Sequence, residues 1–377
     1  MSKHQKHTKL TRRNNGVYGT NEIVFLGVKC SIITNLVQKI AKKNQKKSKI
    51  AYLDASHNDK IQAPNFDTFT FHHSGNLDAN SQTSLNPYNS RIQLSQYDLV
   101  CINGNHYQGE KQVLILDNDK EASVLKRLDQ LNNIQFVVKM NEDSKYFDFL
   151  IENFPTIQNL NCYMIDEIDA ISAHINRLIE EVIPPVQSLI LTGGKSTRMG
   201  TDKALLEYHG MSQQDFLFNQ LSKIFISYKV EKGVYLSVRN DQKSDDKPTI
   251  SDKFLNLGPF GAICSAFQKN PNVAWFVLAT DLPFVDDEII NLLLKHRNPK
   301  KIATAIKGKN NEFPEPLITI WEPKAYPILL NYLSQGYSCP RKVLINSDVE
   351  IVEVDTHYIQ NINTPEEYQK AKQELNT

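Results

Sequence analysis

Short apolar runs alternate with stretches of helical spacing along most of the chain. Five buried strands are predicted in the first half, each from one apolar run. These runs lie at 21–27, 49–54, 97–103, 112–117 and 135–139. Helical spacing covers 32–43 and 166–182, where apolar side chains recur on one face. Because parallel strands are buried on both faces and need helical crossovers, the alternation predicts a mainly parallel α/β sheet.

The same alternation restarts after two adjacent prolines. Pro184 and Pro185 end the preceding helical pattern and stiffen the chain, so they mark a join between domains. Further strands are expected at 186–191, 233–239, 274–280, 301–306 and 350–354. Further helices are expected near 213–227, 259–269, 286–296, 323–334 and 365–375. The 377 residues therefore predict two three-layer α/β domains, at 21–183 and 186–377.

Two segments show little periodicity. Residues 1–20 begin with a basic, polar stretch that lacks the apolar core of a signal peptide, and they are predicted to be a disordered lead-in. Residues 55–95 are rich in asparagine, serine, glutamine and histidine. They predict a long loop region with short strands.

Composition narrows the class of protein. The 43 basic and 42 acidic residues give a net charge of +1, which provides no general reason to expect nucleic-acid or membrane binding. The five cysteines are odd in number and form no CxxC pair, so reduced thiols in a cytoplasmic protein are expected. No apolar run approaches the length of a membrane span.

The string LTGGKSTRMGTDKALL, from Leu191 to Leu206, carries the most chemistry. Gly193 and Gly194 follow a predicted strand, and glycine lets backbone N–H groups approach a phosphate closely. Arg198 and Lys203 can neutralise a triphosphate at the carboxyl edge of the sheet, where α/β proteins bind ligands. A glycine turn before a solvated charged loop is the plain structural alternative.

This string resembles the signature of the MobA family of molybdenum cofactor guanylyltransferases, approximately L-A-G-G-x-S-x-R-M-G-x-D-K-x-L-L. Thr192 replaces the usual alanine, and the other positions agree. The double glycine is more similar to the guanylyl branch than to the cytidylyl branch. The resemblance covers nearly all of 186–377 and implies a nucleotidyltransferase domain with a Rossmann-like, GT-A type fold.

Three later segments resemble the family in the expected order. Asp252 precedes LGPFGA at 257–262, Asp281 lies in ATDLPF, and Asn363 lies in NINTPEE. A carboxylate at the end of a central strand suits Mg²⁺, which prefers oxygen ligands, although Asp281 also fits a helix cap. The segment after Asn363 additionally reads as a helix N-terminus, with Thr364 as its cap.

The resemblance implies roles for individual residues. Lys203, Arg198 and Asp281 would be catalytic, and Asp281 would hold Mg²⁺. The residues that would bind GTP are Leu191, Thr192, Gly193, Gly194, Lys203, Ser237, Asp252, Asp281 and Asn363. The loop at 312–317 would lie on the substrate side, and Arg341 with Lys342 would meet the pterin-linked phosphate.

The implied reaction transfers GMP from GTP to the terminal phosphate of molybdopterin and releases pyrophosphate. A molybdoenzyme or a cofactor-insertion protein is the candidate protein partner. Two alternatives remain open. One is another nucleotidyltransferase, which uses CTP or acts on a sugar phosphate. The other is a non-catalytic cofactor-binding protein.

Residues 21–183 resemble, more weakly, the MobB family of nucleotide-binding adapters. The similarity lies in the strand–turn–helix at 23–40, in LDASH at 53–57 and in the segment 97–117. The family's phosphate loop needs G-x-x-G-x-G-K-[ST], but Ile32 and Ile33 stand at the lysine and serine/threonine positions. An apolar side chain cannot pair with phosphate or hold magnesium, so this domain is predicted to be degenerate and without NTPase activity.

Overall fold

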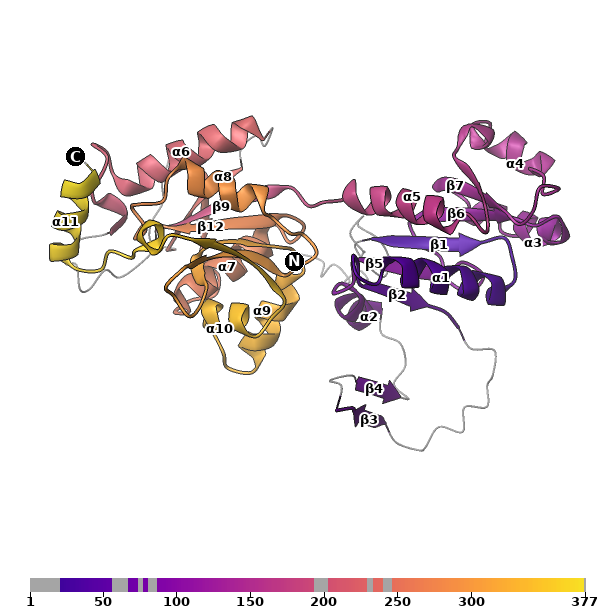
Figure 1. Ribbon diagram of the computed structural model, residues 1–377, viewed down its shortest axis with the longest axis horizontal. Helices are drawn as coiled ribbons and strands as arrows, with labels where there is room; N and C mark the ends of the chain where they lie inside the picture. Colours follow the sequence, from indigo (N-terminus) through magenta and orange to yellow (C-terminus); the bar gives the residue numbers. More distant parts are fainter. Residues whose placement is uncertain are drawn as a thin grey trace, which may run out of the picture. The chain divides into compact units, whose positions relative to one another are not determined.

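The computed structural model describes residues 21–55, 67–73, 77–80, 87–192, 203–228, 233–239 and 246–375 (Figure 1). The chain divides into two compact units, Met1–Val182 and Ile183–Thr377. Each unit is an α/β body with its own core, as the sequence predicts. The N-terminal segment predicted to be disordered lies outside the described residues.

The first unit is built on a six-stranded sheet with the order β2-β5-β1-β6-β7-β8, and all of its pairs are parallel. Its strands are β1 (Glu22–Leu26), β2 (Ile50–Leu53), β5 (Leu99–Asn103), β6 (Lys111–Leu116), β7 (Ile134–Lys139) and β8 (Cys162–Met164). The five strands predicted from apolar runs are confirmed. Strand β8 was not predicted, because three partly exposed residues carry no apolar pattern.

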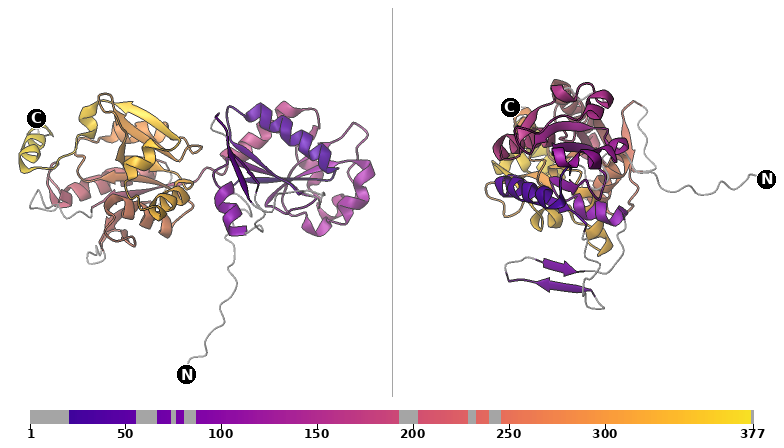
Figure 2. Two further views of the ribbon diagram at one scale, coloured as in Figure 1. Left: turned by 90° about the horizontal axis from the view of Figure 1, so that it is seen from below. Right: turned by 90° about the vertical axis from the view of Figure 1, so that its right-hand side faces the viewer.

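Helices cover both faces of this sheet (Figures 1 and 2). On one face, α1 (Cys30–Asn44) and α5 (Ile168–Glu180) pack into one core through side chains such as Ile33 and Ile175. On the other, α3 (Glu121–Leu125) and α4 (Asp148–Asn153) contribute Val124 and Leu150 to a second core.

The region predicted as a long loop contains more structure than expected. Strands β3 (Thr68–Phe71) and β4 (Leu77–Asn80) form an antiparallel pair, which confirms short strands there. Helix α2 (Pro87–Leu94) corrects the loop prediction for its residues. Its sequence, PYNSRIQL, lacks the apolar spacing that identifies a helix lying on a core.

The second unit is built on a seven-stranded sheet with the order β11-β10-β9-β12-β14-β13-β15. Its strands are β9 (Val186–Leu191), β10 (Val234–Val238), β11 (Thr249–Ser251), β12 (Ala274–Ala279), β13 (Ala303–Gly308), β14 (Glu315–Trp321) and β15 (Val349–Val354). Strand β14 runs antiparallel to both neighbours, and the other pairs are parallel.

Two helix layers enclose this sheet (Figure 1). Helices α6 (Gln213–Ser227) and α8 (Asp287–Lys295) pack on one face, while α7 (Gly258–Lys269), α9 (Ala325–Ser334) and α10 (Pro340–Ile345) pack on the other. Helix α11 (Pro365–Leu375) joins a small separate cluster around Tyr208. The three layers thus leave the carboxyl ends of β9, β10 and β12 at one edge.

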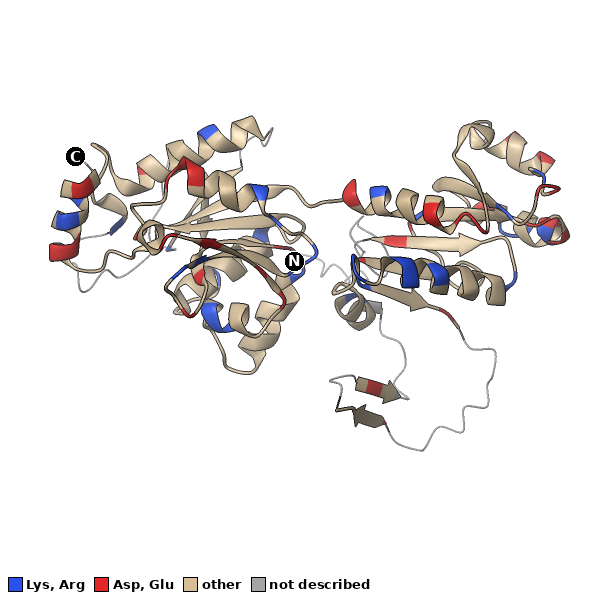
Figure 3. Cartoon of the chain, viewed as in Figure 1, with Lys and Arg blue, Asp and Glu red and all other residues tan. Residues whose placement is uncertain are grey.

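Basic and acidic residues both occur among the described helices of each unit (Figure 3), in keeping with the net charge of +1. Within the described part of the chain, no helix has the length and apolar character needed to cross a membrane.

Candidate functional site

The site lies where the central strands of the second unit end. Strands β9 and β12 are parallel neighbours, and Leu191 lies opposite Ala279 at their carboxyl ends. The hydroxyl of Thr280 donates to the carbonyl of Leu191 at 3.3 Å. The hydroxyl of Thr192 donates to the carbonyl of Ser237 on β10. These bonds hold three strand ends together at the edge where open α/β sheets bind ligands.

Three predicted residues meet at this edge although they are far apart in the chain. Lys203, in the short 3₁₀ helix η4 (Lys203–Leu205), donates from Nζ to Oδ1 of Asn363 at 2.7 Å. The same Nζ lies 3.5 Å from Oδ2 of Asp281. The side chains of Lys203 and Asp281 are 20% and 19% exposed. The ammonium group of Lys203, the carboxylate of Asp281 and the side-chain amide of Asn363 thus lie together in one partly buried site.

The start of α11 positions Asn363. Oε2 of Glu367 accepts from the backbone N–H groups of Asn363 and Thr364 at 2.7 and 3.1 Å. The hydroxyl of Thr364 accepts from the N–H of Glu367 at 3.3 Å, which completes a capping box. The N–H of Ile362 donates to the carbonyl of Asp281. The predicted helix start is confirmed, and it ties the Asn363 loop to β12.

Asp281 is a largely buried carboxylate, and its Oδ1 atom can accept a further hydrogen bond or bind a cation. Burial raises its pKa, and the charge and hydrogen bond of Lys203 act against that rise. Its Oδ1 atom is buried and has no hydrogen-bond partner among the described residues. An uncompensated buried oxygen is costly unless a ligand satisfies it, so this atom fits a cation or a donor brought by substrate.

A second buried carboxylate lies near the first. Glu315, the first residue of β14, is 5% exposed, and its Oε2 accepts from Nη2 of Arg341 at 2.9 Å. Burial raises the pKa of Glu315, Arg341 lowers it, and the nearby charge of Asp281 raises it further. Glu315 was expected in a loop. It lies in a strand, and its ion pair gives Arg341 a protein partner that the sequence did not reveal.

Ser237 and Asp252 form a further pair at the same edge. The Ser237 hydroxyl, on β10, lies 3.5 Å from Oδ1 of Asp252, which follows β11. Burial raises the pKa of Asp252, and the Ser237 hydrogen bond lowers it. Strand β10 pairs with β9, and Thr192 directly follows β9. Ser237 and Asp252 therefore lie next to the strand end that carries Thr192.

Part of the predicted site cannot be placed. Gly193, Gly194 and Arg198 lie outside the described residues. Among the residues that the structure describes, no three histidine, cysteine or acidic side chains are grouped to hold a metal ion.

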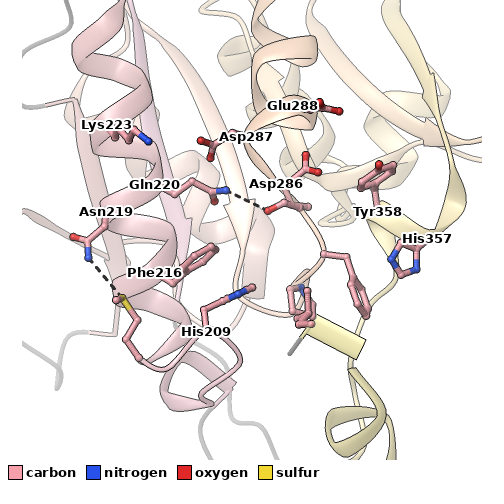
Figure 4. A pocket seen from close by; sticks show the side chains of 15 residues that line it. His209, Phe216, Asn219, Gln220, Lys223, Asp286, Asp287, Glu288, His357 and Tyr358 are labelled. Carbon is pink, nitrogen blue, oxygen red and sulfur yellow. Dashed lines mark hydrogen bonds between the residues drawn. The ribbon is translucent and has the colours of Figure 1, made fainter. Parts of the chain in front are cut away.

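A separate hollow of about 810 Å³ lies between α6 and the loop before α8 (Figure 4). His209 stacks on Phe216 there at 3.7 Å between ring centroids, and burial lowers the histidine pKa. Gln220 donates to the carbonyl of Val285 at 3.5 Å. The predicted site residues do not line this hollow, so it is distinct from the site at the strand ends.

Comparison with known proteins decides the family. The MobA-like NTP transferase domain matches residues 188–350. A molybdenum cofactor guanylyltransferase of Campylobacter jejuni subsp. doylei is 30% identical over 191 residues, which cover 50% of this chain and 95% of that protein. The chain belongs to the family of MobA-like molybdenum cofactor guanylyltransferases. The second unit is called the MobA-like domain below.

Two further similarities accompany the family match. A molybdenum cofactor biosynthesis bifunctional protein of Synechocystis sp. is 32% identical over 189 residues, covering 49% of this chain and 53% of that protein. The chain thus spans about half the length of that relative. The crystal structure of molybdopterin-guanine dinucleotide biosynthesis protein A from Archaeoglobus fulgidus has a TM-score of 0.43 and 20% identity, covering 50% of this chain and 98% of that one. The family resemblance predicted for 186–377 is confirmed, and the MobB resemblance of 21–183 stays a prediction.

Proposed function

We propose that the MobA-like domain transfers GMP from GTP to the terminal phosphate of molybdopterin, forming the guanine dinucleotide cofactor and pyrophosphate. The observation that carries the proposal is the meeting of Lys203, Asp281 and Asn363 at the carboxyl ends of the central strands. The names of the matched relatives support the guanine and cofactor assignments.

The proposed site residues neutralise and position charge. The attacking phosphate is already anionic, so the transfer needs no side-chain general base and depends mainly on placement and charge neutralisation. The ammonium group of Lys203 is fixed by Asn363 and would hold the triphosphate. The backbone at Gly193 and Gly194 would support it, and Arg198 would balance the charge that develops on the leaving pyrophosphate.

Mg²⁺ fits Asp281. Oδ1 of this residue is a buried oxygen without a hydrogen-bond partner among the described residues. Magnesium commonly uses one or two carboxylates together with substrate phosphates, so a single protein carboxylate suffices. When bound there, the ion would supply Lewis-acid neutralisation of the phosphate oxygens.

Guanosine would lie beside β10 and β11. We assign its contacts to Ser237 and Asp252, with Leu191 and Thr192 lining the neighbouring strand end. A carboxylate accepts hydrogen bonds only, and the Watson–Crick edge of guanine presents two adjacent donors. Asp252 is therefore chemically suited to guanine, while the choice of GTP over CTP rests on the names of the matched relatives.

The test is a reconstitution with the full chain, Mg²⁺ and molybdopterin. GTP, CTP, ATP and UTP are supplied in separate reactions, and the dinucleotide is detected by mass. Dinucleotide formation with GTP is expected. Asp281→Ala should abolish it, whereas Asp348→Ala, which removes an acidic side chain that is 73% exposed, should not.

Three outcomes would change the proposal. Wild-type transfer by Asp281→Ala would refute the metal assignment. Transfer only with CTP would make the domain a cytidylyltransferase. Tight molybdopterin binding without turnover by any nucleotide would favour a non-catalytic binding protein.

We further propose that the first unit is a MobB-like adapter without NTPase activity, acting beside the catalytic domain near a molybdoenzyme or a cofactor-insertion protein. In support, Ile33 is fully buried in the core under α1, and Ile32 packs against that core. Neither side chain is available to a phosphate. Magnesium-dependent ATP hydrolysis by the full chain, without molybdopterin, would contradict this proposal.

A further inference from the structure

A cysteine, a histidine and an aspartate converge at the carboxyl edge of the first unit's sheet. Cys30 is the first residue of α1, Asp54 follows β2, and His106 lies in the turn after β5. Sγ of Cys30 is 3.3 Å from Nε2 of His106. That nitrogen also lies 3.7 Å from Oδ1 of Asp54. The three residues thus follow three neighbouring strands, β1, β2 and β5, and His106 contacts both of the others.

Surrounding side chains hold this cluster in place. Oδ1 of Asp54 accepts from Nδ2 of Asn103 at 2.8 Å, and Oδ2 accepts from the hydroxyl of Tyr52 at 2.9 Å. Nδ2 of Asn105 lies 3.4 Å from Sγ of Cys30 and donates toward it. A hydrogen bond donated to sulfur stabilises its anionic form, and Asn105 supplies one such donor to Sγ of Cys30.

We propose that Cys30 is a modification site that reacts with small-molecule disulfides by thiol–disulfide exchange. His106 lies within reach of the thiol proton, and the N-terminal end of a 15-residue helix stabilises negative charge on Sγ. This arrangement makes Cys30 a nucleophile, with His106 holding the proton that the thiol gives up.

The exchange step balances without a further reactant. Sγ of Cys30 attacks one sulfur of the disulfide, and a new S–S bond forms as the old one breaks. The second sulfur leaves as a thiolate with the bonding electron pair. The proton held on His106 passes to that thiolate or to water. One disulfide is consumed and one mixed disulfide is formed, so there is no net change in oxidation level.

Further charged and titratable groups of the described residues lie around the cluster. Lys29 precedes the cysteine in the chain, Tyr52 reaches it through Asp54, and the ring of Tyr107 lies 6.4 Å from that of His106. Nη2 of Arg127 donates to the carbonyl of Asn105 at 3.3 Å, so a positive charge lies beside the residue whose amide donates to Sγ of Cys30. The carboxylate of Asp54 is an acidic group that faces His106.

The cluster is open to small reagents. The side chains of His106 and Asp54 are 16% and 28% exposed, and Cys30 is half-buried. A small disulfide is therefore a better candidate reactant than a cysteine of a folded protein partner.

The remaining cysteines provide internal controls. Cys101 and Cys264 are buried, and burial raises the pKa of each thiol to about 12. Cys162 and Cys339 are exposed. Cys339 also lies at the N-cap of α10, so it controls for exposure and for a helix start together.

The experiment treats the full chain with glutathione disulfide between pH 5 and 9 and locates the adducts by peptide mass spectrometry. Cys30 should react first, at least about 10-fold faster than Cys162 or Cys339 at pH 6, with a midpoint below the value of about 8.5 for free cysteine. His106→Gln should slow Cys30 at pH 6 and move its midpoint upward. His174→Gln, a change elsewhere in the same unit, should leave the midpoint unchanged.

Either of two results would overturn the proposal. One is a Cys30 rate and midpoint in the wild-type chain equal to those of Cys339, a comparison that needs no variant to fold. The other is an unchanged pH profile in folded His106→Gln, with folding checked by circular dichroism. The reaction needs neither GTP nor molybdopterin, so its outcome is independent of guanylyl transfer.

Discussion

A buried ion pair beside Pro184 permits a quantitative test of the stability of the MobA-like domain. Nε and Nη2 of Arg297, which follows α8, donate to the two carboxylate oxygens of Glu322 at 2.7 and 2.8 Å. Nη2 also donates to the carbonyl of Pro184 at 2.8 Å. The two side chains are 12% and 1% exposed. The pair thus joins the ends of α8 and β14 to the segment before β9.

The perturbation is Arg297→Leu, which leaves the Glu322 carboxylate buried without its partner. Breaking a buried pair from one side costs about 3–5 kcal/mol. At about 2–4 °C per kcal/mol for a unit of this size, the melting temperature should fall by about 6–20 °C. Because two leucines leave no uncompensated charge, Arg297→Leu/Glu322→Leu should recover most of that loss.

Tryptophan fluorescence is a selective assay for this unit. The chain contains two tryptophans, Trp275 on β12 and Trp321 on β14, and both are fully buried in the MobA-like domain. Their emission therefore follows unfolding of this domain without a tryptophan signal from the first unit. Thermal and urea transitions of the single and double variants complete the double-mutant cycle.

A surface pair serves as the matched control. Lys301 and Asp348 form an ion pair in the same domain, with side chains 32% and 73% exposed. Lys301→Leu should change the free energy of unfolding by no more than about 1 kcal/mol. If Arg297→Leu costs as little as this control, water must reach the Glu322 carboxylate in the folded domain, and the predicted loss of stability is refuted.

Two further predictions concern other parts of the fold. Burial, reinforced by the Arg177 charge, lowers the pKa of His174, so the folded state favours the neutral ring. This contribution is present above the unfolded pKa of about 6.5 and is lost as pH falls below it. The hydrogen-exchange protection factors of α5, which are corrected for the pH dependence of the intrinsic exchange rate, should therefore fall at low pH, and less so in His174→Gln. Separately, a Cβ on Gly261 would lie 2.3 Å from the carbonyl oxygen of Phe254. Gly261→Ala should therefore shift α7 and lower the free energy of unfolding, measured by tryptophan fluorescence, by about 1–3 kcal/mol. The control Gln268→Ala, at an exposed position of the same helix, should leave the free energy of unfolding almost unchanged.

The sequence predicted the central strands because their burial leaves a continuous apolar run. Strands β8 and β11 were not predicted, because each is only three residues long. Strand β14 was not predicted for a different reason. It begins with Glu315 and Pro316, a pair that is typical of a loop, and its burial depends on antiparallel pairing with β12.

The candidate site likewise contains residues that the sequence identifies and residues that only the folded structure brings together. Lys203, Asp281 and Asn363 could be proposed because their segments resemble the family signature, and Asp281 and Asn363 also stand beside a strand end and a helix start that the sequence marks. Glu315 could not be assigned in this way, because its proximity to Asp281 arises from the pairing of β12 with β14. Its ion pair with Arg341 likewise depends on where α10 packs.

The bond between Lys203 and Asn363 spans 160 positions of the chain. The last strand of the sheet, β15, ends at Val354, so the strands of the MobA-like domain all precede Asn363 in the sequence. Loss of the α11 start would therefore remove the partner of the lysine while every strand of the sheet stayed in the chain. The framework of the domain and the completion of its proposed phosphate site thus depend on separate segments.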